Sequence, residues 1–354
     1  MTSLRNLSFG SGARHIKAAR PSKIFRSTAL LLFTLWVSHS FAAPQEECVG
    51  RYRLTLPSEA DVALTTAKAF REPQESNIRF PDGLFAPLSS FIYNGTFYIT
   101  EAITHDGYDA LVDTMKNRVA ASQNKQFQDQ RLSVLPVRDT SSFAWSGRGG
   151  AAFYAFKNGR TITFLTKSQD VQEASGDALD VLEHLEPRST GDIPVEPGVC
   201  LPGLFVKTSQ VDKSRIVGST YRLQSHLDVL IFFRDSKALK DQPKLTARQE
   251  SEFVWTNEFG VGKAVKLRGA SPWRTVKLDG REGVGSFGAI TRNDDSTDYG
   301  YLVTVQGNPD ASTDTPDLLL YVERNASAAE GKAPVTADEL EKIGAEIAAS
   351  IKRR

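Results

Sequence analysis

The pair Cys48 and Cys200 constrains this chain most, because no other cysteine occurs in its 354 residues. Each cysteine lies in a short segment, residues 47–57 and residues 198–206, in which an apolar run with strand character follows a glycine. The second cysteine lies 152 positions after the first. Each segment is expected to mark the start of a structural unit, so the sequence predicts two units of related architecture.

The first 42 residues have the pattern of a secretory signal sequence. They carry six basic residues and no acidic one, and an apolar run at 29–37 precedes the small residues Ser40 and Ala42. That run is too short for a stable membrane span, and Glu46 and Glu47 just before Cys48 argue against a lipoprotein site. We expect a signal peptide over residues 1–42, a periplasmic location and no membrane anchor after cleavage.

Export would place both cysteines in an oxidising compartment, where a single pair is expected to form a disulfide. We therefore predict a Cys48–Cys200 bond, with two buried free thiols as the alternative. In the chain-entropy treatment, a bond across this separation stabilises the fold by at most about 5 kcal/mol.

Residues 47–186 are predicted to form an N-terminal α+β domain. Asn94-Gly95 and Asn158-Gly159 each separate two runs rich in aromatic and β-branched residues, which predicts hairpins with type I′ turns. Helices are expected over 106–121, with Asp106 as the cap, and over 169–185, with Val171 among the inward residues.

A stretch rich in proline and glycine, residues 187–198, predicts a linker to a C-terminal α+β domain over 199–354. Its strand candidates are 203–207, 219–223, 228–233, 264–267, 275–278, 300–305 and 318–323. Asp279-Gly280 marks a further turn, and Thr336 with Glu339 predicts a capping box at the start of the last helix. The fold class is α+β: two domains of related architecture, each mainly antiparallel sheet with a closing helix.

The charge balance disfavours a nucleic-acid partner. Without the leader, 37 basic residues stand against 42 acidic ones, so the mature chain is mildly acidic. A protein that binds nucleic acid needs a basic surface.

No catalytic, cofactor or metal site emerges from the motifs. His105, His184 and His226 have no metal-ligand spacing to one another, and Ser286 lies in a segment that lacks the first glycine of a nucleophile elbow. Gly283, Gly285 and Gly288 match a dinucleotide pattern only on paper, since strand and turn residues follow them instead of a helix. We therefore expect a protein without enzymatic activity and without a cofactor.

Four segments in chain order resemble a known family: residues 48–57, 198–205, 274–283 and 347–351. By these segments the chain is similar to the immunity proteins that protect bacteria from lipase effectors of the type VI secretion system. The resemblance implies a periplasmic two-domain protein that binds a cognate phospholipase effector and inhibits it, by gripping its lid or by covering its active site.

An inhibitor of this kind needs anchor side chains for its partner, and large aromatic residues are the usual anchors of protein interfaces. Aromatic residues near polar or glycine-rich loops are the candidates, although most large aromatics are buried in a core. The candidates are Phe143, Trp145, Trp255, Phe259 and Trp273. Two other functions stay open: an envelope hydrolase with an unrecognised site, and a periplasmic protein that binds a solute or an envelope component.

Overall fold

The computed structural model describes residues 43–66, 78–86, 88–101, 104–127, 131–168, 170–208, 212–240, 245–258 and 264–354. These described residues form one compact unit. The predicted signal peptide, residues 1–42, lies outside the described residues. Among the residues described, no helix is both long and apolar enough to cross a membrane.

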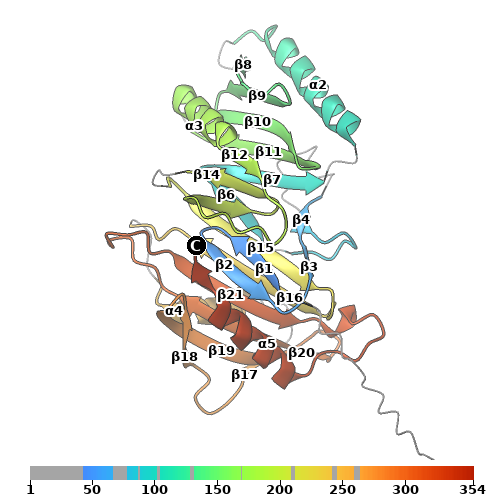
Figure 1. Ribbon diagram of the computed structural model, residues 1–354, viewed down its shortest axis with the longest axis vertical. Helices are drawn as coiled ribbons and strands as arrows, with labels where there is room; N and C mark the ends of the chain where they lie inside the picture. Colours follow the sequence, from blue (N-terminus) through green and yellow to red (C-terminus); the bar gives the residue numbers. More distant parts are fainter. Residues whose placement is uncertain are drawn as a thin grey trace, which may run out of the picture. The chain divides into compact units, whose positions relative to one another are not determined.

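Antiparallel strands make up most of the described chain, with helices between them (Figure 1). The helices are α2 (His105–Ser122), α3 (Val171–Glu183), α4 (Ala247–Phe253) and α5 (Ala337–Ser350), with a π-helical turn at Val254–Glu258 and a 3-10 turn at Ala326–Ala328. The first twelve strands are β1 (Gln45–Val49), β2 (Tyr52–Leu56), β3 (Ala60–Val62), β4 (Leu64–Thr65), β5 (Ile78–Arg79), β6 (Ser90–Tyr93), β7 (Thr96–Glu101), β8 (Ser133–Leu135), β9 (Ser142–Gly147), β10 (Gly150–Lys157), β11 (Arg160–Thr166) and β12 (Leu185–Pro187). The others are β13 (Gly198–Leu201), β14 (Leu204–Lys207), β15 (Arg215–Leu223), β16 (Val229–Ser236), β17 (Ala264–Leu267), β18 (Arg274–Leu278), β19 (Arg281–Thr291), β20 (Thr297–Val305), β21 (Asp317–Arg324) and β22 (Lys352–Arg353). The α+β class with mainly antiparallel sheet is confirmed.

The three predicted tight turns are confirmed. Asn94-Gly95 joins β6 to β7, Asn158-Gly159 joins β10 to β11, and Asp279-Gly280 joins β18 to β19. Asn94, Asn158 and Asp279 have φ of 50°, 49° and 55°. Such left-handed conformations favour Asn, Asp and Gly, and for this reason the turns could be predicted from the sequence.

The main sheet shows that two halves of the chain repeat one arrangement. In the described residues its strands run in the order β17-β19-β20-β21-β16-β15-β6-β7-β11-β10-β9-β8. From the centre outward, β15-β16-β21-β20-β19-β17 and β6-β7-β11-β10-β9-β8 have the same order of chain positions, and β6 pairs with β15 where the halves meet. The predicted relation between the two units is therefore visible in the strand order, where sequence identity could not show it.

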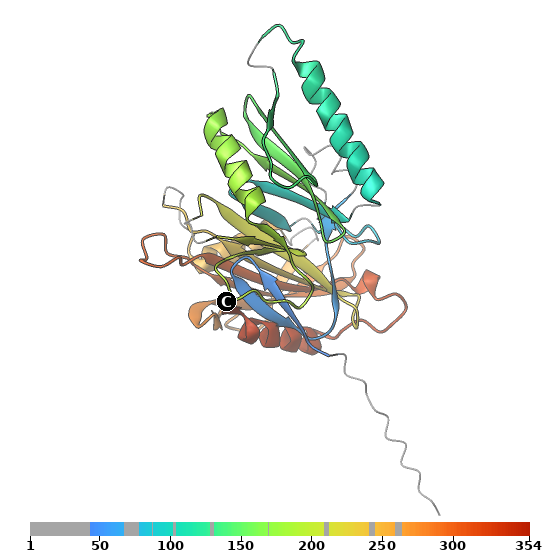
Figure 2. The same cartoon turned by 45° about the horizontal axis from the view of Figure 1, so that its top comes forward.

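Each half packs one helix on each face of its sheet (Figures 1 and 2). Side chains of a strand alternate between faces, so Phe153 joins the core under α3 whereas Tyr154 joins the cluster under α2. In the other half, Val303 lies in the core with α5 and Leu302 in the cluster with the π-helical turn after α4. The α3 and α5 face shares one continuous core, while α2 and α4 cover two smaller clusters.

Two small sheets exchange strands between the halves. The hairpin β1–β2 pairs with β22, which follows α5, and the hairpin β13–β14 pairs with β12, which follows α3. In Figure 1 the blue β1 and β2 accordingly lie beside the C-terminus. The hairpin β1–β2, which precedes the first half in the chain, is thus held by the last strand of the second half. The hairpin β13–β14, which precedes the second half, is held by the last strand of the first half.

The predicted disulfide is confirmed and joins the two hairpins. Cys48 and Cys200 are bonded with Cα atoms 5.7 Å apart, and both are almost fully buried. Next to the bond, Gly50 and Cys200 exchange two backbone hydrogen bonds of 2.9 and 2.7 Å. The bond therefore fixes a junction that the backbone also forms.

The boundary at residues 187–198 stays a prediction. Within this stretch, Arg188 is buried and forms an ion pair of 3.2 Å with Glu47 on β1. A buried pair between such distant residues fastens the stretch to the first hairpin.

Some local expectations are wrong. Thr104, rather than Asp106, caps α2, because its side chain accepts a hydrogen bond from the backbone N–H of Gly107. Val171 is the first residue of α3 and is exposed, not inward. The predicted capping box of α5, Thr336 with Glu339, is confirmed, and α4 has another that was not expected.

Candidate functional site

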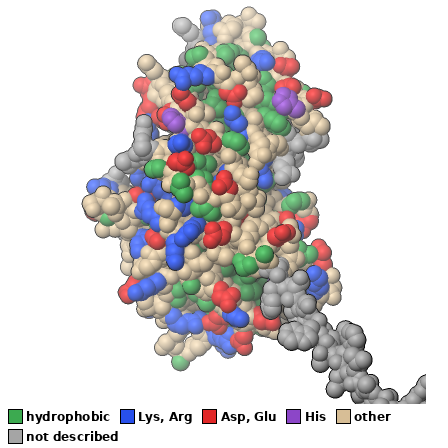
Figure 3. All heavy atoms as spheres, viewed as in Figure 1, with side chains coloured by type: hydrophobic (Ala, Val, Ile, Leu, Met, Phe, Trp, Pro, Cys, Tyr) green, Lys and Arg blue, Asp and Glu red, His purple; other side chains and the backbone are tan. Residues whose placement is uncertain are grey.

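The described surface is hollowed where β22, the β1–β2 turn and the loop 306–316 meet. Two adjoining hollows of about 530 and 330 Å³ share Lys237, Ala238 and Pro309 among their lining residues. We call these two adjoining hollows together the trough. On the face shown in Figure 3, Lys and Arg side chains gather in this region, near the C-terminus. Of the described residues that line the trough, all except Arg51 lie between residues 192 and 354.

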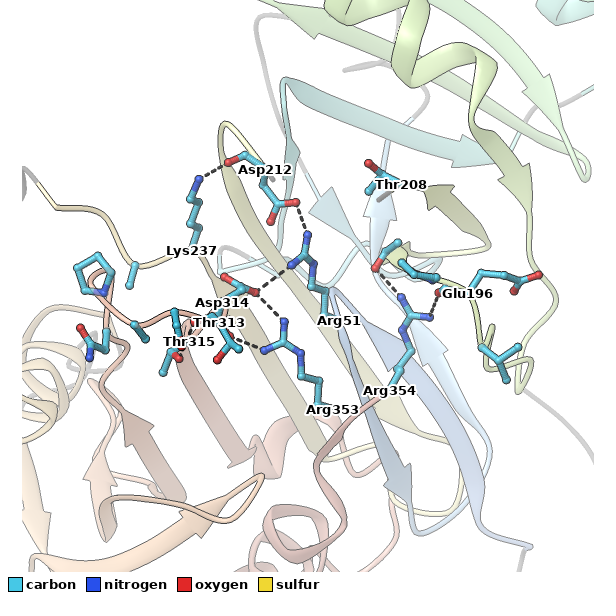
Figure 4. Close-up of a pocket in the computed structure, with 18 residues that line it drawn as sticks. Arg51, Glu196, Thr208, Asp212, Lys237, Thr313, Asp314, Thr315, Arg353 and Arg354 are labelled. Atoms are coloured by element: carbon cyan, nitrogen blue, oxygen red, sulfur yellow. Dashed lines mark hydrogen bonds and ion pairs between the residues drawn. The ribbon is translucent and has the colours of Figure 1, made fainter. Parts of the chain in front are cut away.

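Arg51 reaches the trough because of the turn in which it lies. Gly50 has φ of 59°, and a Cβ atom there would come within 2.4 Å of the carboxylate of Asp235. A glycine thus lets the turn lie directly on β16, where the backbone N–H of Arg51 donates to Asp235 Oδ2 at 2.9 Å. The side chain of Arg51 then extends into the trough (Figure 4).

A buried ion network forms the floor of the trough. Arg215 is fully buried and pairs with Asp235 at 3.0 Å, with Asp314 at 2.8 Å and with Asp212. Arg51 contacts two of the same carboxylates, Asp212 at 2.5 Å and Asp314 at 3.1 Å. Because buried charges are stable only when paired, these contacts hold five side chains from four separate segments in one arrangement.

Asp314 is the carboxylate on which three guanidinium groups converge. Besides Arg215 and Arg51, Arg353 of β22 lies 3.0 Å from Asp314 Oδ2, and Figure 4 shows Arg51 and Arg353 both directed toward it. Burial by itself raises the pKa of Asp314, but the three guanidinium groups outweigh it and hold the pKa below its ordinary value. Asp314 therefore stays ionised and fixes the loop 306–316 to the β1–β2 turn and to β22.

Arg354 closes the other side of the trough. It donates to the backbone carbonyls of Pro194 at 2.7 Å and Gly198 at 2.5 Å, and its own N–H donates to Arg51 O at 3.1 Å. Burial, with Arg188 and Arg51 nearby, lowers the pKa of Arg354 to about 10. The group is still a cation at neutral pH, so it adds positive charge to the trough.

Cations outnumber carboxylates among the described residues that line the trough. Among the described lining residues the cations are Arg51, Lys213, Arg215, Arg234, Lys237, Arg353 and Arg354, and the carboxylates are Glu196, Asp212, Glu250, Asp314 and Asp317. Asp212 is almost fully buried between Arg51 and Arg215, and Glu250 pairs with Arg234 at 2.5 Å. Glu196, by contrast, is about half exposed at the rim. The lining residues therefore carry two more cations than carboxylates, and one of these cations, Lys213, is paired with Glu173 and Asp177 outside the trough.

Exposed apolar side chains also gather at the trough. Large hydrophobic residues with exposed surface number nine in the described part of the chain, and four of them line the trough. These four are Val195, Ile216, Leu239 and Leu245, exposed by 38% to 93%. Apolar side chains beside fixed charges are typical of a surface that binds another protein.

The predicted anchor residues lie elsewhere. Phe143 and Trp145 are on β9; Phe143 is buried and Trp145 half-buried, in the cluster under α2. Trp255 is only 4% exposed, and its indole N–H donates to Ser286 Oγ of β19 at 2.8 Å. Trp273 is half-buried, with Arg248 stacked on its ring. Phe259 lies outside the described residues.

The described residues show no group of three His, Cys, Asp or Glu side chains placed to hold a metal ion. His105 and His184 each pair with an Asp one helical turn away, on the exposed faces of α2 and α3. Ser286 and the three glycines of the formal dinucleotide pattern lie within β19, so they do not form a loop before a helix.

Sequence reasoning placed no trough residue in a binding site, because the trough is built from segments far apart in the chain. Arg51 and Asp314 are 263 positions apart, and Arg215 is 99 positions from Asp314. The one local signal is the run Lys352-Arg353-Arg354, three successive cations after an amphipathic helix.

Comparisons with known proteins point to one family. Residues 192–354 match the family described as Tle cognate immunity protein 4 C-terminal domain. No curated protein matches the chain by sequence.

Solved structures have the same fold. The immunity protein TplEi of the type VI secretion system from Pseudomonas aeruginosa, complexed with an "L" peptide, is similar with a TM-score of 0.59 at 14% identity, over 89% of this chain and 99% of that chain. TplEi in its apo form gives 0.57 at 15% identity, over 89% and 98%. A chain of the Tle4-Tli4 complex gives 0.58 at 16% identity, over 88% and 97%. The likeness covers both halves of the described chain, and at these identities it concerns the fold.

Proposed function

We propose, from the premise that residues 192–354 of this chain belong to the family of the Tle cognate immunity protein 4 C-terminal domain, that the protein is an immunity protein against a type VI secretion phospholipase effector. It binds the effector and inhibits it. The family match carries this proposal, because it covers every trough residue except Arg51.

The solved relatives support a binding role. One is a complex of Tle4 with Tli4, and another is an immunity protein with a bound peptide. Both share the fold over nearly all of their own length. Because these proteins of the same fold bind a protein or a peptide, their likeness supports a binding function for this chain.

The proposed site of action is the periplasm. The pattern of residues 1–42 is that of an export signal, and a structural disulfide such as Cys48–Cys200 forms and persists in oxidising compartments. A phospholipase that reaches the periplasm meets the membrane there, so an inhibitor is needed in the same compartment.

Inhibition needs no chemistry by this protein. A partner that grips the lid of a lipase or covers its active site prevents turnover by blocking a conformational step or substrate entry. The trough, with its fixed charges and exposed apolar side chains, is the surface of the described chain best suited to such a contact.

The proposal predicts that a lipase is encoded beside this protein, and the test uses that lipase. We expect the mature chain to bind it with a nanomolar or lower Kd, and a stoichiometric amount to abolish its hydrolysis of phospholipid vesicles. Co-expression in the periplasm should relieve its toxicity, whereas expression without the leader should not. If the two purified proteins do not bind and hydrolysis continues, the proposal is wrong.

A further inference from the structure

We propose that the trough receives a segment of the partner protein in which carboxylate side chains stand next to apolar ones. This inference rests on the proposed function, since the partner is the effector, and adds the chemistry of the segment that is recognised.

The charge of the trough selects for carboxylates. Its own acids Asp212 and Asp314 are paired with Arg51 and Arg215, and Asp314 is also paired with Arg353. Lys237 and Arg353 keep exposed surface at the trough. The carboxylates at the floor hold the arginines in place. The lining residues of the trough include more cations than carboxylates, so their net charge is positive. An acidic segment therefore meets cations that are already positioned, which reduces the entropy lost on binding.

The apolar side chains select for a polypeptide instead of a free anion. Ile216, Leu239 and Leu245 line the hollow that adjoins the charged one, and Lys237 borders both. A small anion would leave these apolar side chains in water. A protein segment that carries an acidic and an apolar residue can cover both hollows and remove that apolar surface from water.

The rigidity of the floor argues for recognition of a fixed pattern. Arg215 and Asp235 are fully buried, and the disulfide lies beside the same turn that carries Arg51. Charges held by a network of this kind discriminate against a partner with cations in the same positions, because like charges repel where neither side can move away.

The first test removes charge from the trough while keeping polar side chains at the same positions. The double variant Lys237→Gln/Arg353→Gln should bind the effector about tenfold more weakly at 50 mM salt, with the difference shrinking at 300 mM because salt screens exposed charges. The matched control is Lys277→Gln/Lys342→Gln, two cations on β18 and α5 that are exposed by 61% and 76% and lie outside the trough. It should bind within twofold of the wild type.

A variant that is expected to bind the effector more tightly makes the test independent of folding, because a damaged fold would weaken binding. Glu196→Gln removes a half-exposed carboxylate from the rim, so it should strengthen binding about twofold to threefold. Weaker binding by this variant, together with wild-type binding by Lys237→Gln/Arg353→Gln, would overturn the inference. Thermal unfolding of each variant separates lost binding from lost fold.

The second test reports on the partner's chemistry directly. A zero-length carbodiimide reagent joins a lysine amine to a carboxylate with loss of water, so in the wild-type complex Lys237 should become linked to an Asp or Glu of the effector. Leu239→Ser should weaken binding several-fold, and Phe127→Ser, an exposed apolar residue outside the trough, should not. An effector that binds wild-type protein but gives no link to Lys237, and is unaffected by Leu239→Ser, would contradict the inference while leaving the proposed function intact. Failure of wild-type binding would contradict both.

Discussion

The turn between β10 and β11 and the loop between β20 and β21 occupy equivalent places in the two halves, yet they differ in length and in role. The first is the two-residue turn Asn158-Gly159, and the second is the loop 306–316. Only the second carries Asp314 and lines the trough. The comparison teaches that the framework is repeated, whereas the candidate binding surface comes from a loop that one half has and the other lacks.

The exchanged hairpins explain how two similar halves become one unit. After β12, the backbone N–H of Arg188 donates to Gly203 O, and after β22, that of Arg354 donates to Arg51 O, so the two junctions are built alike. They differ in the number of ion pairs. Around Arg51 several ion pairs form one network, whereas beside Gly203 Arg188 forms one buried pair with Glu47, and the side chain of Arg160 occupies the space that a Cβ atom would fill.

The largest expected effect comes from breaking the network at Arg51. Arg215→Met would leave Asp235 buried without its guanidinium partner, which should cost about 3–5 kcal/mol of unfolding free energy. The matched control is Arg222→Met on the same strand, whose partner Asp82 is 44% exposed and can be hydrated, so the cost should be about 1 kcal/mol. Urea unfolding measures both. Equal costs for the two variants would show that the charged junction has no special role.

The disulfide is expected to have the next largest effect. Cys48→Ala/Cys200→Ala should lower the unfolding free energy by about 2–4 kcal/mol, because the unfolded chain gains freedom when the bond is lost. If the exchanged strands hold the halves together, unfolding should remain a single transition at lower urea concentration. Trp145 reports on one half, and Trp255 and Trp273 on the other. Two separate fluorescence transitions would break the comparison, since each half would then be stable alone.

The smallest effect concerns the pH dependence of the loop 306–316. The folded pKa of Asp314 is below its ordinary value, so its contribution to stability is present above about pH 4 and is lost as the pH falls further. At pH 7, Asp314→Asn should cost about 1–2 kcal/mol, and this difference from the wild type should shrink toward zero below pH 4. Acid titrations of unfolding free energy measure it. Asp139→Asn, whose carboxylate holds Lys157 beside the β10–β11 turn, is the control in the other half. A difference at Asp314 that grows as the pH falls would contradict the ion-pair explanation.

Much of the local structure was predictable from the sequence. Asn94-Gly95, Asn158-Gly159 and Asp279-Gly280 signal their turns through backbone conformations that few residues adopt. The capping box of α5 is equally local. The short α4 and the full length of β19 were not predicted. The surroundings of Trp255 explain why α4 was not predicted. Its segment is helical because it packs over β19 to β21, and this contact cannot be predicted from the local sequence pattern.

The sequence by itself determined the fold class, the turns, the closing helix and the pairing of its two cysteines, because each depends on residues close in the chain or, for the cysteines, on there being a single possible pair. The tertiary structure decided which half holds each hairpin and where the trough lies. Strand pairing and ion pairs between residues such as Arg51 and Asp314 join positions hundreds of residues apart. Whether such residues come into contact depends on the packing of the whole chain, so these contacts cannot be predicted from a local sequence pattern.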